Sequence, residues 1–150
     1  TTLAVGRSYR TNNAAIAQLR DLLTPRGVAI DVYDVPHDLG PEWCLHFMSV
    51  ISPVRERLAV VYERLAPVAL LQELSRRGIE WVSVPEEDYA SLGCNVLAVA
   101  PGTVVIASGN ERTVELLEAR GVDVHVYDAS EISKGEGGPT CLTRPVLRLG

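Results

Sequence analysis

The chain of 150 residues has 47% hydrophobic residues and a formal net charge of −5, a composition typical of a globular domain with a sizeable core. It has no basic block, which argues against a nucleic-acid groove, and no apolar run of the roughly 18 residues that cross a bilayer. Cys44, Cys94 and Cys141 form no CxxC pair, so neither a zinc site nor a disulfide framework is indicated. We therefore expect a cytoplasmic protein that binds neither nucleic acid nor membrane.

The first predicted strand covers residues 3–5, and the segment IAQLRDLLTPRGVAIDVYDVP then predicts an amphipathic helix followed by a second strand. The same plan, a helix ending in Arg-Gly and then a strand, recurs in VALLQELSRRGIEWVSVPEED and in VELLEARGVDVHVYDASE. Gly27, Gly78 and Gly121 stand where a helix C-cap needs a left-handed residue. Asn110 is predicted to cap the helix of the last segment.

Further strands are predicted over residues 45–51, 58–62, 96–100 and 104–107, with a tight turn at Pro101-Gly102 joining the last two. The three glycines are 51 and 43 residues apart. This spacing predicts an α/β fold built from a ββαβ-like module repeated about three times. Because no GxGxxG or GxxxxGK[ST] motif follows a strand, a phosphate-cradling nucleotide site is not expected.

Cys141 is the cysteine whose sequence context best fits a nucleophile. It follows the glycine-rich stretch KGEGGPT, where the backbone can approach a ligand closely. A reactive cysteine must form the thiolate and needs a base or a positive charge nearby; the alternative for Cys141 is a small, buried apolar side chain. Cys44 and Cys94 lie in apolar, strand-like runs, which favours structural roles for both.

Three histidines and one arginine are of the residue types that could serve a site. His46 lies in the mostly apolar run WCLHFMS, where it is either hydrogen-bonded in the core or held for acid/base work. Arg10 follows the first strand in a loop, and its guanidinium suits a carboxylate; the alternative is a solvated arginine beside a helix cap. The contexts of His37, in a turn, and His125, in a strand, favour surface or structural roles.

The elements GRSYRTN, LHFMS and GGPTCLTRP resemble, in this order, the guanidino-group-modifying enzyme superfamily, which includes arginine deiminases, dimethylarginine dimethylaminohydrolases and amidinotransferases. The intervals, 36 residues from Arg10 to His46 and 95 from His46 to Cys141, fit this resemblance. It implies the family's five-bladed α/β propeller (pentein), with about three of five modules present. Residues 1–150 are then expected to be the C-terminal part of a single catalytic domain, with the N-terminal modules of the same protein absent from this chain.

The resemblance implies a cysteine hydrolase that acts on the guanidinium group of arginine or Nω-methylated arginine, with no metal and no cofactor. Cys141 would attack the guanidinium carbon, and His46 would protonate the departing amine and then activate water, giving citrulline through a thiouronium intermediate. Arg10 matches the family arginine that holds the substrate's α-carboxylate. The alternatives are an amidinotransferase, which passes the amidino group to an acceptor amine, and an inactive fragment or binding module.

Two features depart from the family pattern. The family's acidic partner of the histidine belongs upstream of GRSYRTN, which begins at Gly6, so the chain is expected to be incomplete as an enzyme; Glu131 or Glu136 is the substitute if it is not. Arginine deiminases carry His-x-Asp, whereas HFMS at residues 46–49 is closer to the His-x-x-Ser pattern of the dimethylarginine hydrolases. Besides a guanidino substrate and the N-terminal modules, the sequence leaves a homo-oligomer open as a partner.

Overall fold

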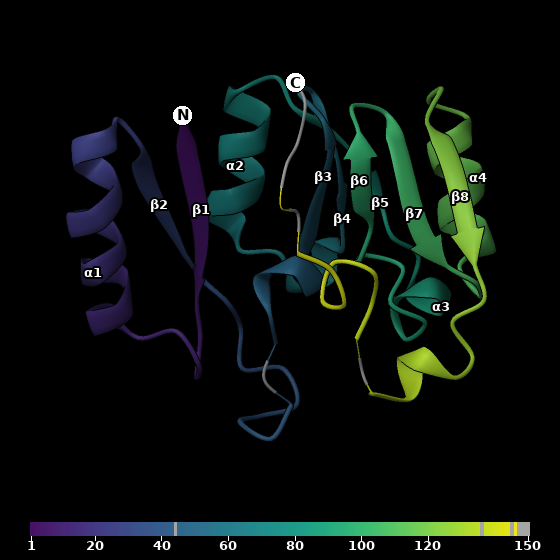
Figure 1. Cartoon of the computed structure of the whole chain (residues 1–150), viewed down its shortest axis with the longest axis horizontal. Coiled ribbons are helices and arrows are strands. Elements are labelled where there is room, and N and C mark those ends of the chain that lie inside the picture. Colours follow the sequence, from purple (N-terminus) through teal and green to yellow (C-terminus); the bar gives the residue numbers. More distant parts are fainter. Residues whose placement is uncertain (44, 136, 145, 147–150) are drawn as a thin grey trace.

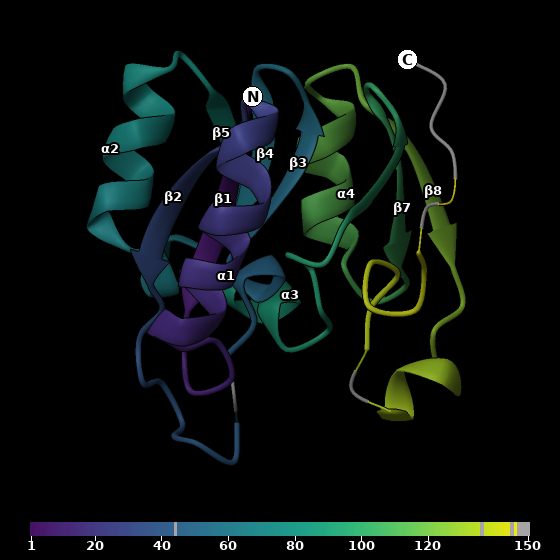
Figure 2. The same cartoon turned by 60° about the vertical axis from the view of Figure 1, so that its left-hand side comes forward.

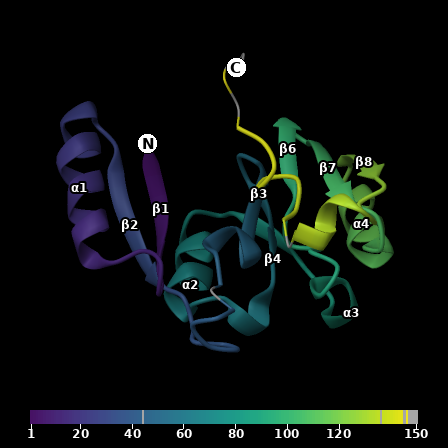
Figure 3. The same cartoon turned by 60° about the horizontal axis from the view of Figure 1, so that its bottom comes forward.

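Three small sheets stand side by side in the computed structural model, which describes residues 1–43, 45–135, 137–144 and 146 (Figure 1). In the first sheet, β1 (Thr2–Arg7) and β2 (Ala29–Asp34) pair in parallel. They are joined by α1 (Asn13–Leu23) and the 3-10 turn η1 (Thr24–Arg26). Figures 1 and 3 show this sheet and α1 at one side of the molecule, next to the second sheet.

The second and third sheets share one order: an antiparallel hairpin, a helix, and a strand parallel to the second strand of the hairpin. The second sheet consists of β3 (Ile51–Arg55), β4 (Leu58–Val61) and β5 (Glu80–Ser83), with η3 (Glu63–Leu65) and α2 (Val68–Arg76) between the last two. The third consists of β6 (Leu97–Ala100), β7 (Thr103–Ala107) and β8 (Asp123–Tyr127), with α4 (Glu111–Glu118) before β8. The predicted ββαβ order therefore occurs in both sheets, and the first sheet has the order βαβ.

Gly27, Gly78 and Gly121 occupy equivalent positions, as predicted: each follows a helical segment and precedes the strand that completes its sheet. Their φ angles are +75°, +63° and +70°, in the left-handed region that disfavours residues with a Cβ. No described atom lies within 4 Å of a Cβ built on any of the three. Backbone conformation, and not lack of space, therefore calls for glycine here.

The predicted strand over residues 45–51 is wrong for most of its length. Phe47–Ser49 form a short 3-10 helix, η2, and β3 begins only at Ile51 and runs through Pro53 to Arg55. Proline is tolerated because β3 is the edge strand of its sheet, where one side of the backbone has no strand partner. His46 therefore precedes a helical turn, while Cys44 lies outside the described residues.

Asn110 directly precedes α4, as predicted, but its side chain does not cap the helix. Its Nδ2 donates instead to the main-chain oxygen of Ser91 at 2.8 Å. The cap comes from Asp88, a buried carboxylate in the short helix α3 (Glu86–Tyr89). Its Oδ2 accepts from the main-chain nitrogen of Thr113 at 2.6 Å and from the Thr113 hydroxyl at 2.7 Å. The N-terminus of α4 is thus satisfied by a distant residue.

Strand β4 contributes to two hydrophobic clusters. Val60 belongs to the cluster that includes Ile106 of β7 and Leu117 of α4, and all three side chains are fully buried. Val61 belongs to the cluster that includes Tyr33 of the first sheet. Because successive side chains of a strand point to opposite faces, β4 packs toward both neighbouring sheets. None of the helices in the described ranges has the length and apolarity that crossing a bilayer requires.

Candidate functional site

The segments that carry Arg10, His46 and Cys141 lie toward the same end of the strands. Figures 1 and 2 show the loop after β1, the turn η2 before β3 and the yellow segment near the chain end in the lower half of the molecule. All three residues are exposed. Within the described ranges, no hydrogen bond or ion pair joins any two of them. The meeting of His46 with Cys141 therefore stays a prediction.

The loop after β1 is a tight turn that leaves the Arg10 side chain exposed. Ser8 and Thr11 exchange two main-chain hydrogen bonds of 3.2 Å, which close the turn around Arg10. Asn12 then caps the N-terminus of α1, because its Oδ1 accepts from the main-chain nitrogen of Ala15 at 2.9 Å. The guanidinium of Arg10 has no hydrogen-bond or ion-pair partner among the described residues. It is available to an anion such as a carboxylate.

Arg7, in the same sequence element, has a structural role. Its Nε and Nη2 donate to the two carboxylate oxygens of Asp34 at 2.5 and 2.7 Å, and its Nη1 donates to Asn13 at 2.9 Å. The hydrogen bonds and charge of Arg7 lower the pKa of the Asp34 carboxyl, because both favour its ionised form. This network ties the ends of β1 and β2 to the start of α1.

His46 is anchored to the first sheet through its neighbour Phe47. The His46 carbonyl accepts from the main-chain nitrogen of Ser49 at 2.8 Å and opens η2. The Phe47 ring stacks on Tyr33 with ring centroids 5.7 Å apart. A Cβ on Gly6 would lie only 2.8 Å from the Phe47 Cβ, so glycine permits this approach. The close contact brings the segment of His46 against the strand that leads to Arg10.

Cys141 lies on a turn that is held by Asn95. The Cys141 main-chain nitrogen donates to the Gly138 oxygen at 3.0 Å. Asn95 is only 4% exposed; its Oδ1 accepts from the nitrogen and the hydroxyl of Thr140, and its Nδ2 donates to the Cys141 sulfur at 3.1 Å. A Cβ on Gly138 would lie 2.5 Å from the Asn95 Cγ. The glycine at 138 therefore makes room for an internal side chain.

Asn95 could not be recognised as a site residue from the sequence, because GCNVL looks like a continuous apolar strand. The available signal was the amide itself, since a buried amide needs hydrogen-bond partners. The neighbouring backbone is fixed by Ser52 of β3, which is fully buried. The Ser52 hydroxyl donates to the Cys94 oxygen at 2.6 Å and accepts from the Val96 nitrogen at 3.2 Å.

The environment of Cys94 fits its predicted structural role. The side chain is buried, and its burial raises the pKa of the Cys94 thiol to about 12. A thiol that stays protonated at neutral pH is a poor nucleophile. Of the two cysteines that the structure describes, Cys141 alone is exposed.

The other two histidines occupy surface positions, as predicted. His37 contacts the Tyr9 hydroxyl through Nδ1, and the two rings meet edge to face with centroids 5.8 Å apart. His125 lies on β8 with Nε2 3.3 Å from a carboxylate oxygen of Asp123. Neither histidine contacts Cys141 in the described part of the chain.

Of the two carboxylates expected as substitutes for the family's acidic residue, the structure describes Glu131. Glu131 accepts two hydrogen bonds from the Lys134 ammonium at 2.7 and 2.8 Å. Glu136 lies outside the described residues. The residues that the structure describes also include no group of three or more His, Cys, Asp or Glu side chains placed to hold a metal ion.

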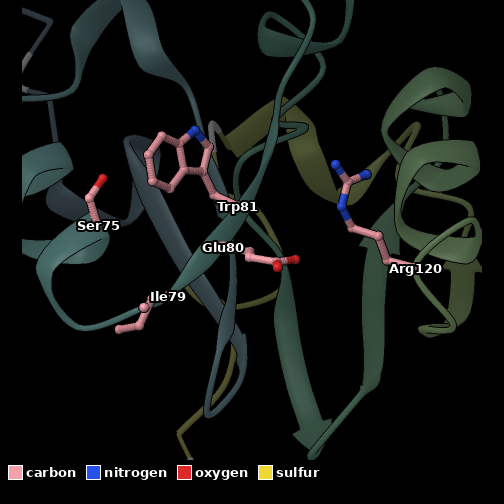
Figure 4. Close-up of a pocket in the computed structure, with 6 residues that line it drawn as sticks. Ser75, Ile79, Glu80, Trp81 and Arg120 are labelled. Atoms are coloured by element: carbon pink, nitrogen blue, oxygen red, sulfur yellow. The ribbon is translucent and has the colours of Figure 1, made fainter.

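A surface hollow of about 480 Å³ lies away from these segments, between the ends of α2 and α4 (Figure 4). Figure 1 shows both helix ends at the upper side of the molecule. Its described lining consists of Ser75, Gly78, Ile79, Glu80, Trp81 and Arg120. This lining includes neither a cysteine nor a histidine. The hollow therefore contains neither Cys141 nor His46, the proposed nucleophile and acid/base.

Solved structures of guanidino-modifying enzymes share this fold. A dimethylarginine dimethylaminohydrolase from Pseudomonas aeruginosa, solved as a mutant complexed with citrulline, aligns with a TM-score of 0.75 at 21% identity, over 94% of this chain and 50% of that chain. SxtG, an amidinotransferase from Microseira wollei, aligns with a TM-score of 0.78 at 19% identity, over 99% of this chain and 45% of that chain. This chain thus shares the mixed α/β fold of these two enzymes.

Sequence comparison identifies the family to which the chain belongs. A family model described as Arginine deiminase matches residues 55–148, more than half of the chain, and the chain belongs to that family. The uncharacterized protein YkgA of Bacillus subtilis (strain 168) is 31% identical over 144 residues, 96% of this chain and 48% of the relative. The arginine deiminase of Clostridium perfringens (strain SM101 / Type A) is 50% identical over 56 residues, 37% of this chain and 14% of the relative. The chain therefore spans half or less of the length of these relatives.

Proposed function

We propose that this chain carries the nucleophile and the acid/base of a cysteine hydrolase that acts on the guanidinium group of arginine or Nω-methylated arginine. The observation that carries the proposal is the exposed Cys141 thiol, seated on a turn held by Asn95 within the region that matches the family model. Cys94, in the same region, is buried and stays protonated at neutral pH. Cys141 is the described cysteine that a substrate can reach.

The proposed reaction has two halves. The Cys141 thiolate attacks the guanidinium carbon to form a C–S bond, and the C–N bond to the leaving amine breaks as protonated His46 gives that nitrogen a proton. The product of this half is an S-alkylthiouronium on Cys141. Neutral His46 then removes a proton from water, the hydroxide attacks the same carbon, and the thiolate leaves. The hydroxyl proton of the tetrahedral intermediate is released as the thiolate leaves and is taken up by the amine. The sum is therefore guanidinium cation plus water to citrulline plus a protonated amine.

The features around Arg10 and His46 support an arginine-like substrate. The Arg10 guanidinium, which has no partner among the described residues, offers a fork of donors for the α-carboxylate. Met48 stands where the aspartate of His-x-Asp would stand, and its thioether cannot pair with a guanidinium charge. This favours a methylated guanidinium, which keeps fewer N–H donors than arginine itself. The two substrates are distinguished by the amine that is released, which is a methylated amine from methylated arginine and ammonia from arginine.

The acidic partner of His46 and the remaining modules of a five-bladed propeller are proposed to come from outside these 150 residues. The chain spans 48% of its Bacillus subtilis relative and 50% of the Pseudomonas aeruginosa chain, which supports this. Two carboxylates of the described chain are engaged in ion pairs, Asp34 with Arg7 and Glu131 with Lys134.

The test is citrulline formation by the full-length protein with arginine and with methylated arginine as substrates. We expect Cys141→Ser to lower the rate by at least about a thousandfold, because a serine hydroxyl has no base strong enough to replace a thiolate. Acid quenching of the parent enzyme should trap a mass adduct on the peptide that contains Cys141. Cys94→Ala is the matched control and should keep most of the rate.

Three outcomes contradict the proposal in different ways. Citrulline formation that survives in Cys141→Ser would remove Cys141 as the nucleophile. Transfer of the amidino group to an added acceptor amine, in place of citrulline, would identify an amidinotransferase. Substrate binding with no product from the full-length protein would identify a binding module.

A further inference from the structure

We infer that Asn95 is a positioning residue for the nucleophile: its amide holds the Cys141 sulfur as a hydrogen-bond acceptor, in the orientation that a thiolate needs. This inference rests on the proposed role of Cys141. Asn95 itself does not touch the reacting carbon in this scheme. It acts through the sulfur and through the turn that carries it.

The orientation of the Asn95 amide follows from its partners. The main-chain nitrogen of Thr140 can only donate, and it lies 3.1 Å from the Asn95 Oδ1. The Thr140 hydroxyl donates to the same oxygen. The amide oxygen must therefore face Thr140, which leaves the Nδ2 group to face the sulfur of Cys141. A flipped amide would set two N–H donors against each other.

An N–H donor aimed at sulfur favours the thiolate over the thiol. A thiolate is a charged acceptor and forms the stronger, charge-assisted hydrogen bond, whereas a thiol is only a weak acceptor. The carboxamide carries no charge and does not titrate, so it offers this donor at every pH. It also limits the sulfur to the side of the turn that faces Asn95.

Asn95 can hold the sulfur only if the amide itself is held, and its surroundings do this. Its main-chain nitrogen donates to the Leu92 oxygen at 2.8 Å. On either side of it, the main-chain oxygen of Cys94 and the main-chain nitrogen of Val96 both form a hydrogen bond with the buried Ser52 hydroxyl. Ser52 belongs to β3, the strand that follows η2. One buried hydroxyl thus links the support of the nucleophile to the strand that follows the His46 segment.

The turn fits closely against this amide on its other side. Gly138 approaches so near that a Cβ would lie 2.5 Å from the Asn95 Cγ and 2.7 Å from its Oδ1. Gly138 also accepts from the main-chain nitrogen of Cys141 at 3.0 Å. The amide is therefore enclosed by the turn that it supports, and the sulfur cannot move far without breaking this contact.

The decisive variant is Asn95→Asp, which keeps an acceptor for Thr140 and removes the donor to sulfur. The measurement is the rate at which iodoacetamide alkylates Cys141 in the folded chain, followed by peptide mass spectrometry from pH 6 to pH 10. We expect the rate at neutral pH to fall roughly tenfold to a hundredfold, the effect of losing a hydrogen bond to a charged group. The rising part of the pH profile should move to higher pH.

Two variants separate positioning from general stability. Asn110→Asp changes an equally buried amide that contacts Ser91 and not Cys141, and should leave the Cys141 alkylation rate within about twofold of the parent. Thr140→Val removes one bond to Asn95 but keeps the donor to sulfur, and should also stay within about twofold. Circular dichroism and a urea titration report whether each variant is folded.

An unchanged rate in Asn95→Asp would overturn the inference, and so would an equal slowing in Asn110→Asp. Alkylation requires no turnover, so the result stands apart from the proposed function. If Cys141→Ser abolishes citrulline formation while Asn95→Asp alkylates at the parent rate, the proposed function survives and the role of Asn95 fails. If Cys141→Ser stays active while Asn95→Asp alkylates slowly, the reverse holds.

Discussion

Gly6 and Gly138 each occupy a place where another segment fills the space of a side chain. At Gly6 the intruding group is Phe47, and at Gly138 it is Asn95. Both glycines belong to sequence elements that carry a proposed site residue. At these two positions the missing Cβ allows distant parts of the chain to touch. Such glycines bring together segments that carry proposed site residues, and the approach of the glycines before Cys141 to a ligand stays a prediction.

At the same scale, Arg10→Ala is expected to weaken substrate binding selectively. The Arg10 guanidinium is unpaired in the described chain, so its loss leaves no internal partner exposed and should cost little stability. Binding of an arginine-like substrate should weaken by about 2–5 kcal/mol if the carboxylate pair is desolvated. Binding constants for arginine and for agmatine, which lacks the carboxylate, would measure this.

The matched control for Arg10 is Arg20→Ala, because Arg20 is an exposed arginine within α1. It should leave both binding constants unchanged. An equal loss for both ligands in Arg10→Ala would show that Arg10 does not recognise the carboxylate.

At the scale of elements, helix ends behave in two ways. The glycines that follow α2 and α4 stop the helix through their own backbone conformation, with φ of +63° at Gly78 and +70° at Gly121. The start of α4, in contrast, depends on Asp88 from another helix. The C-terminal ends of α2 and α4 are therefore determined by residues adjacent in sequence. The start of α4 depends on a tertiary contact.

We expect Gly78→Ala and Gly121→Ala each to lower the free energy of unfolding by about 1–2 kcal/mol, because alanine resists the left-handed conformation. Space is available at both sites, so a clash adds nothing. Urea unfolding followed by tryptophan fluorescence would give these values. Gly135→Ala is the control: its surroundings are equally open in the described chain and its φ is not positive, so it should stay within about 0.5 kcal/mol.

At the scale of the whole molecule, the second sheet holds the other two through β4. Val60 and Val61 are both fully buried, and they belong to different hydrophobic clusters. Tyr33 of the first sheet belongs to the same cluster as Val61. A substitution that disturbs packing in one cluster is therefore expected to affect β4, which also contributes to the other cluster.

Leu117→Ala should lower the free energy of unfolding by about 2–5 kcal/mol, because it removes a fully buried leucine from the cluster shared by the second and third sheets. The comparison is Leu22→Ala, a leucine of α1 that is 54% exposed, which should cost less than about 1 kcal/mol. Chemical denaturation at one pH measures both. Similar costs for the two variants would contradict the assignment of the core.

Helix ends and the recurring helix–strand plan were predictable because they depend on neighbours in the chain. A glycine after a helix, or Pro101-Gly102 between two apolar strands, acts within a few residues, and the structure has the expected turn at each place. Cys94 was likewise predictable as a structural cysteine from its apolar run.

Three features depended on contacts between distant segments. Residues 47–49 form a helical turn because Phe47 packs on Tyr33 and beside Gly6, a contact that overrides their apolar, strand-like sequence. Asn95 supports Cys141 from 46 positions away. Asp88 caps α4 from 25 positions before Thr113. Local propensity describes a residue's preference among backbone conformations, but a buried amide or carboxylate takes its partner from whichever segment the fold packs against it. The residue types around Cys141 were therefore readable in the sequence, while its hydrogen-bond partner was decided by tertiary packing.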